Sequence, residues 1–216
     1  MATRPDPTED AERDDAAVVP MRERILQTAE ALLRRHGPAK TSVVDVSRAL
    51  NMSHANVYRH FASKAALHDA VAERWLHRVS APLADIASGP GTAAERLEAW
   101  VLTLMAMKRR KVLDDPEMFA TYHAVAMAAR DVVDAHVAML QRQLEDIIEC
   151  GIDSGEFART DAIEAARAVF NATARFHHPH HVREAAGRDS ADEERAARAV
   201  VRLLVAGLRR TNEQSC

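Results

Sequence analysis

Apolar residues at helical spacing, interrupted only by short stop signals, constrain the fold of this chain more than any other feature. Leu67, Val71 and Trp75 recur every four residues, which places them on one face of a helix. The breaks between such segments are brief, as at His36-Gly37. Seven glycines, eight prolines and 4% aromatic residues among 216 are too few for a turn-rich β sandwich. We predict an all-α fold of about nine helices.

Charge divides the chain into three segments. The formal net charge is -3, but it is unevenly distributed. Residues 1–20 carry two basic and six acidic side chains, and residues 21–80 carry ten basic and five acidic ones. Residues 81–216 carry seventeen basic and twenty-one acidic side chains. We expect residues 1–20 to form a disordered acidic tail. Breaks at Pro82 and at Ser88-Gly89-Pro90-Gly91 separate a basic domain, 21–80, from a second helical domain, 81–216. The basic block indicates a partner of its own, although a solvated helical surface explains it equally well.

Cysteine content and hydropathy indicate the compartment. The two cysteines, Cys150 and Cys216, are too few for a disulfide framework or a four-cysteine zinc site, and their scarcity fits a reducing environment. The sequence contains no apolar run of about 18 residues, the length that a membrane span needs. The acidic N-terminus lacks the apolar stretch of a signal peptide. We therefore expect a cytoplasmic protein with no membrane partner, and we assign it no cofactor.

Residues 41–64 predict two short helices joined by a tight turn. Val46, Leu50, Met52, Val57 and Phe61 can form a small core that these helices share. The end of such a helix fits the major groove of DNA. Six side chains would then face outward: Ser53, His54, Ala55, Asn56, Tyr58 and Arg59. This spacing is typical of a helix-turn-helix unit, but other small three-helix packings share it, so both interpretations stay open on spacing alone.

A longer match adds to this pattern. Residues 22–76 resemble the N-terminal DNA-binding domain of the TetR family of bacterial transcriptional regulators, and the most specific part is the run Tyr58, His60, Phe61 and Lys64. The rest of the chain, including the stretch 151–157, resembles the helical ligand-binding and dimerisation domain of that family. The resemblance implies a repressor that a small molecule releases from operator DNA. It implies no enzyme, and we assign no catalytic residue.

The resemblance also implies roles for individual residues. It places ten in the DNA interface: Thr41, Ser42, Ser53, His54, Ala55, Asn56, Tyr58, Arg59, His60 and Lys64. The first two would contact phosphate, residues 54–56 would face bases, and Tyr58, His60 and Lys64 would hold further phosphates. Asn56 can read adenine through two hydrogen bonds, or contact a phosphate or water instead. Asn51 and residues 54–56 stand where the family often has glycine, so the operator sequence is not carried over.

The resemblance further implies a small-molecule pocket in the second domain. Its candidate residues lie on the helices expected between residues 92 and 150, and their methionine and aromatic side chains adapt to varied apolar ligands. They are Trp100, Leu104, Met105, Met118, Phe119, Tyr122, His123 and Met127. Tyr122 and His123 are the best polar candidates, and each residue of the set can instead be ordinary core.

The last two long helices, at about 161–178 and 191–210, have an apolar face. Paired with the same face of a second subunit, they can form a four-helix interface. Its candidate residues are Ile163, Ala166, Val169, Phe170, Val200, Leu203 and Leu204. One short recognition helix makes few base contacts, and two subunits on two half-sites multiply them. We therefore expect a homodimer, although the same residues can serve only the core.

Four histidines in five positions suggest an alternative function. Imidazole nitrogens bind Zn, Ni or Cu, so a metal-binding helical bundle or a metal-responsive regulator could use the cluster His177, His178, His180 and His181. Pro179 breaks the helix inside the cluster, and we identify no acidic residue close in sequence to orient the rings. We assign no metal ligand on this basis.

Overall fold

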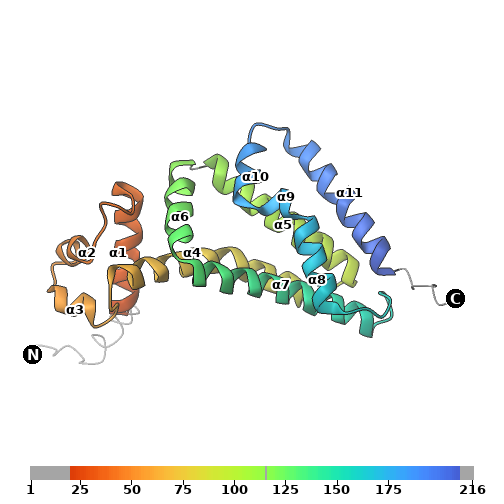
Figure 1. Cartoon of the computed structure of the whole chain (residues 1–216), viewed down its shortest axis with the longest axis horizontal. Coiled ribbons are helices and arrows are strands. Elements are labelled where there is room, and N and C mark those ends of the chain that lie inside the picture. Colours follow the sequence, from red (N-terminus) through yellow and green to blue (C-terminus); the bar gives the residue numbers. More distant parts are fainter. Residues whose placement is uncertain (1–19, 115, 210–216) are drawn as a thin grey trace, which may run out of the picture. The chain divides into compact units, whose positions relative to one another are not determined.

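A computed structural model describes residues 20–114 and 116–209, without the side chains of residues 116–118. Within these ranges the chain forms eleven α-helices and no strand, which confirms the predicted all-α class (Figure 1). The chain divides into two compact units, one ending at Leu67 and the other beginning at His68. This division falls inside helix α4 (Lys64–Ala87), earlier than the break predicted at residues 82–91. The predicted acidic tail lies outside the described residues, except for Pro20.

Three helices and the start of α4 form the first unit. They are α1 (Met21–His36), α2 (Val43–Ala49) and α3 (His54–Tyr58). Val46, Val57 and Phe61 of the predicted shared core are buried, whereas Leu50 and Met52 are half-buried. Burial of these apolar side chains stabilises α2 and α3, which with seven and five residues are too short to be stable alone.

Pro82 does not end its helix, contrary to the prediction from the sequence. It lies inside α4, which continues to Ala87. Proline removes one backbone hydrogen bond and strains the preceding turn. Val79 and Leu83, on either side of it, are both fully buried in the core of the second unit. Their burial holds the helix together across the proline.

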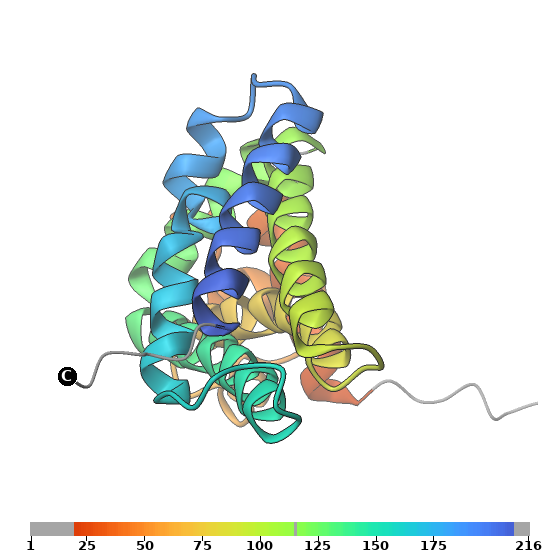
Figure 2. The same cartoon turned by 90° about the vertical axis from the view of Figure 1, so that its right-hand side faces the viewer.

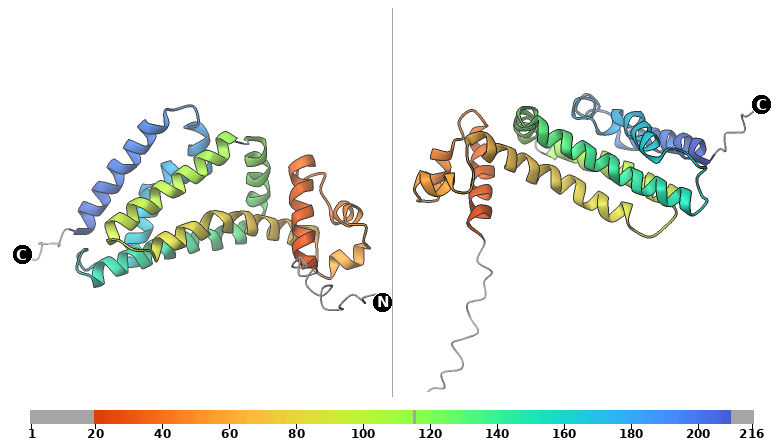
Figure 3. Two further views of the ribbon diagram at one scale, coloured as in Figure 1. Left: turned by 180° about the vertical axis from the view of Figure 1, so that it is seen from behind. Right: turned by 60° about the horizontal axis from the view of Figure 1, so that its bottom comes forward.

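The second unit contains the rest of α4 and seven further helices. They are α5 (Ala93–Asp114), α6 (Pro116–Ala128), α7 (Arg130–Asp153), α8 (Ala162–Ala172), α9 (Ala174–His177), α10 (Pro179–Glu184) and α11 (Ser190–Arg209). Helix α11 lies between α5 and α8 (Figure 2), and α7 runs along the C-terminal half of α4 (Figure 3). No helix in the described ranges is both long and apolar enough to span a bilayer.

A buried chain of hydrogen bonds joins three helices of this unit. The indole Nε1 of Trp100 on α5 donates to Oε1 of Gln143 on α7, at 2.9 Å. The Nε2 of Gln143 in turn donates to the carbonyl oxygen of Ser80 on α4, at 3.1 Å. Both side chains are buried, so each polar atom needs such a partner.

The two helices beyond the predicted nine arise from the segment 161–184. The sequence predicted one helix from Asp161 that Pro179 would end or kink. The backbone instead breaks at Thr173, whose hydroxyl donates to the carbonyl oxygens of Val169 and Phe170 at 2.8 and 3.2 Å. Pro179 then begins α10, at the one helical position where its missing N–H costs nothing.

The end of α7 and the turn that follows it pack very closely against α5. A Cβ added at Gly151 would lie 2.2 Å from Cδ2 of Phe157 and 2.8 Å from Cβ of Ala93, so only glycine fits there. Glu156, in the turn after α7, accepts hydrogen bonds from the backbone N–H groups of Ala93 and Ala94, at 2.6 and 3.2 Å. It thereby caps the start of α5.

Candidate nucleic-acid interface and effector site

The turn between α2 and α3 fixes the exposed face of α3. Asn51 adopts φ of 52° in this turn, a left-handed conformation that asparagine tolerates better than most residues. The Met52 N–H donates to the Ser47 carbonyl oxygen at 2.9 Å, and the Ser53 hydroxyl accepts from the Asn56 N–H at 3.3 Å. These bonds start α3 at a defined residue and therefore set which side chains point outward.

The outer face of α3 and its flanks is polar and accessible. Seven of the predicted DNA contacts are exposed: Ser53, His54, Ala55, Tyr58, Arg59, His60 and Lys64. Asn56 is half-buried, and its side-chain oxygen accepts a hydrogen bond from the Arg59 guanidinium. Val57, between them in sequence, is fully buried. The helix thus has one face for the core and one for a partner.

Of the two residues expected to contact phosphate from the start of α2, Thr41 is buried and Ser42 is half-buried. Thr41 is fully buried, and its hydroxyl donates to the Gly37 carbonyl oxygen at 2.9 Å. The Ser42 hydroxyl forms a capping box with Asp45, whose carboxylate accepts from the Ser42 N–H at 2.9 Å. That hydrogen bonding lowers the pKa of Asp45. The Ser42 hydroxyl therefore caps α2, the Thr41 hydroxyl bonds the residue that ends α1, and the Thr41 side chain is not accessible to a phosphate.

Most of the residues predicted to line the effector pocket are buried. Trp100 and Leu104 belong to the main core of the second unit, whereas Met105 and Phe119 belong to two smaller apolar clusters. Met127 is 60% exposed, and the side chain of Met118 lies outside the described part. Because Trp100 and Leu104 lie in the main core, their positions fit the alternative that they serve ordinary core packing.

Tyr122 and His123, the two polar candidates, lie in aromatic pairs. The ring of Tyr122 stacks on that of Trp75, with centroids 4.9 Å apart and planes at 8°. The His123 ring lies parallel to Phe119, with centroids 6.3 Å apart. Trp75 thus joins the candidate effector site from α4, where the sequence pattern placed it only on one face of a helix.

A basic cluster of Lys108, Lys111 and His136 adjoins this aromatic pair and was missed from the sequence. The Nζ atoms of Lys108 and Lys111 lie 5.8 and 4.5 Å from the centroid of the Trp75 ring. Burial, and secondarily the charge of Lys111, lower the pKa of Lys108 to about 8. Burial, followed by the charges of Lys108 and Lys111, lowers the pKa of His136 to about 4. The cluster combines cation–π contacts with a concentration of positive charge.

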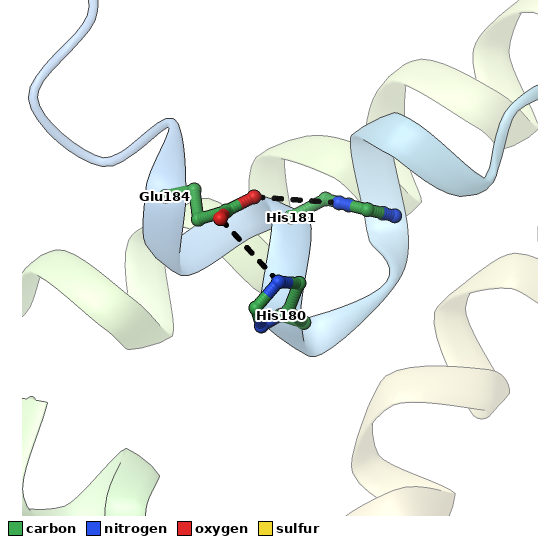
Figure 4. A group of neighbouring side chains, drawn as sticks. All are labelled: His180, His181 and Glu184. Atoms are coloured by element: carbon green, nitrogen blue, oxygen red, sulfur yellow. Dashed lines mark ion pairs between the residues drawn. The ribbon is translucent and has the colours of Figure 1, made fainter.

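The histidine cluster does not form one site. His177 is buried and bonds through Nε2 to the Phe170 carbonyl oxygen at 3.0 Å. His180 and His181 are exposed and pair with Glu184, at 3.3 and 3.6 Å (Figure 4). Glu184 corrects the prediction that no acidic residue lies close enough to orient the rings. Ligand atoms of these three residues lie within 4.8 Å of one another, but all three share one six-residue helix and face solvent.

The apolar faces predicted for dimerisation are partly exposed. Ile163 on α8 and Leu203 on α11 are 48% and 75% exposed, whereas Ala166 and Val169 are buried within the subunit. Phe170, Val200 and Leu204 are half-buried. Beside them, a groove of about 810 Å³ lies between α5 and α11, and none of the predicted effector residues lines it. Only part of the predicted face is therefore available to a second subunit.

Two family models match the chain. Residues 25–71 match the model described as "Bacterial regulatory proteins, tetR family". Residues 93–201 match the model described as "Tetracyclin repressor-like, C-terminal domain". The first range contains α2 and α3, and the second contains the basic cluster.

Individual proteins show the same relationship. A probable acrEF/envCD operon repressor of Escherichia coli (strain K12) is 33% identical over 70 residues. These residues span 32% of this chain, and the match covers only 30% of the length of that protein. A crystal structure from Pseudomonas aeruginosa PAO1, assigned as a transcriptional regulator, has a TM-score of 0.63 at 21% identity, covering 86% of this chain and 90% of that one. FadR of Bacillus subtilis, solved with stearoyl-CoA, has a TM-score of 0.56 at 16% identity and covers 85% and 97%. At these identities the two structures show a shared fold.

Proposed function

This chain belongs to the TetR family of bacterial transcriptional regulators, and from that premise we propose that it is a homodimeric repressor released from its operator by a small molecule. It is a DNA-binding regulator, and the family is one of regulators rather than enzymes. We infer that it acts in the cytoplasm, where its DNA target lies.

The exposed polar face of α3 carries this proposal. Tyr58 is 49% exposed, and Lys64 is also exposed, so both are free to hold phosphates. Asn56 is oriented through its side-chain oxygen by Arg59, which leaves its amide N–H group to donate to a base. Phosphate contacts set the position of the helix, and base contacts set its sequence preference.

Two subunits and an effector complete the proposed mechanism. The five residues of α3 contact few base pairs, and two half-sites multiply the selectivity. We infer that the exposed parts of α8 and α11, with Ile163 and Leu203, contribute to the contact between subunits. An effector that binds the DNA-free conformation more tightly lowers the operator affinity by the ratio of its two affinities.

Three substitutions test the division of roles at the interface. Operators selected from genomic fragments are titrated by fluorescence anisotropy, together with variants that carry single base-pair changes. Tyr58→Phe and Lys64→Ala should weaken binding to all sequences alike, and Lys64→Ala should also lower the salt dependence. Asn56→Ala should cost about 1–3 kcal/mol and relax the preference at one base pair.

Arg142→Ala is the matched control for loss of charge, because Arg142 is an exposed residue of α7 in the second unit. It should leave both affinity and preference unchanged. If Asn56→Ala weakens every sequence equally, or if all three variants behave alike, the assignment of base reading to Asn56 is wrong.

A further inference from the structure

Lys108 is a buried cation for which the described side chains provide no counter-ion. Its side chain lies on α5, only 7% of the residue is exposed, and its contact is the face of the Trp75 ring. Across the described part of the chain, no carboxylate pairs with this ammonium group. Burying a charge without an ion pair or hydrogen bonds is costly. A bound anion can supply the partner that no described residue provides for this ammonium group.

His136 on α7 presents a second unsatisfied group. It is 6% exposed, and both of its ring nitrogens are buried without a hydrogen-bond partner. A neutral imidazole carries one N–H donor and a protonated one carries two. Helix α7 packs on α5, the helix of Lys108, and burial first and the charge of Lys108 second lower the pKa of this ring. Buried polar atoms are rarely left unpaired unless they serve a function.

Outside the undescribed side chains of 115–118, the other titratable groups around Lys108 are basic as well. Lys111 on α5 lies over the same Trp75 ring. Burial is the main cause that lowers the pKa of His177 on α9 and of His178, which precedes α10. The charge of Lys108 contributes to both shifts, and His123 on α6 contributes to that of His178. Among the residues whose side chains the structure describes, no acidic group contributes to any of these shifts. Positive charge concentrated in an environment of low dielectric constant attracts an anion strongly.

We propose that the effector of this regulator is a small organic anion whose negative group binds between Lys108 and His136, beside the Trp75–Tyr122 pair. This inference rests on the proposed function, because it names the chemical class of the effector. The stacked rings of Trp75 and Tyr122 provide an apolar surface for the body of the ligand. Carboxylates and phosphate monoesters share the required chemistry.

Matched probes separate charge from shape. The full chain is titrated with benzoate and hexanoate against the neutral amides benzamide and hexanamide, and with phenyl phosphate, all at constant ionic strength. The thermal midpoint and the intrinsic fluorescence of the two tryptophans report binding in the absence of DNA. At least one anion should bind ten or more times more tightly than its neutral amide. The ratio of benzoate to phenyl phosphate affinity then distinguishes a carboxylate from a phosphate ligand.

Variants assign the effect to the buried cation. Lys108→Met keeps the length of the side chain and removes its charge, so it should raise the thermal midpoint of the free protein and weaken the anion at least tenfold. Lys108→Arg should retain most of the binding, and His136→Gln should weaken it to a lesser extent. Arg110→Met on the same helix is the matched control, because Arg110 is exposed, and it should leave binding unchanged.

Three results overturn the inference: amides that bind as tightly as the anions, no anion of the set that binds, or Lys108→Met binding the anions as the wild type does. Operator release is then measured by anisotropy with the same probes. If neutral compounds release the DNA and anions do not, the inference fails but the repressor function stands. If no genomic DNA binds selectively, the proposed function fails, whatever the anions do.

Discussion

Two buried histidines should make the folded second unit sensitive to acid. Burial lowers the pKa of His136 and of His177 to about 4 each, and the residues are only 6% and 7% exposed. The ordinary value in an unfolded chain is about 6.5. Between these pH values the unfolded chain binds protons that the folded chain cannot accept. Stability is therefore present above about pH 6.5 and is lost as the pH falls towards 4.

The size of this effect follows from the two pKa values. At pH 5 a histidine with a pKa of 6.5 is almost fully protonated in the unfolded chain, whereas one with a pKa of about 4 is mostly neutral in the folded chain. The difference corresponds to about 2 kcal/mol for each histidine, and to about 4 kcal/mol for the pair, relative to neutral pH. That amount is a large share of the stability of an ordinary domain.

Urea unfolding followed by circular dichroism at pH 7.5 and pH 5.0 measures the loss. The wild type should lose about 4 kcal/mol, and His136→Gln or His177→Gln about 2 kcal/mol each. The double variant should lose little through this mechanism. Comparing the two pH values within each variant removes any constant cost of the substitution. If all four proteins lose the same free energy, these two histidines are not the source of the acid sensitivity.

Further variants test packing and assembly. Gly151→Ala should lower the free energy of unfolding by about 1–3 kcal/mol, because the new Cβ overlaps Phe157. Gly207 lies in α11, and a Cβ added there meets no heavy atom within 4 Å. Gly207→Ala should therefore raise the free energy of unfolding by about 0.5–1 kcal/mol in the same urea assay. If both substitutions change the free energy of unfolding equally, the packing argument is wrong. Leu203→Glu should shift the dimer towards monomer in sedimentation analysis, whereas Leu113→Glu, also exposed, should not. An unchanged dimer would exclude Leu203 from the subunit contact.

Local signals predicted the first unit and the helical class well. Helix periodicity and the capping residues Ser42 and Ser53 act within a few positions of the chain, so they are visible in the sequence. The failures involved tertiary contacts. Pro82 remains inside α4 because residues on both sides of it are buried, and Thr173 breaks a helix that its sequence pattern would continue.

The candidate effector site shows the same limit. The prediction relied on aromatic and methionine residues, and Trp100 and Leu104 proved to be part of the main core. Lys108 follows these two residues at intervals of four on the same helical face, and this register was the available signal that a charge is buried there. The partners from α4 and α7, Trp75 and His136, are distant in sequence, so only the fold brings them to the lysine.

Selective, salt-dependent binding of DNA by two subunits is the central claim, and one anisotropy measurement tests it. The purified chain is titrated onto its best genomic fragment and onto a shuffled fragment of the same composition, at several salt concentrations. The selected fragment should bind at least about 10³-fold more tightly, with two subunits per site and an affinity that falls steeply as salt rises. Equal affinity for the two fragments at every salt concentration, or no binding to either, would contradict the account.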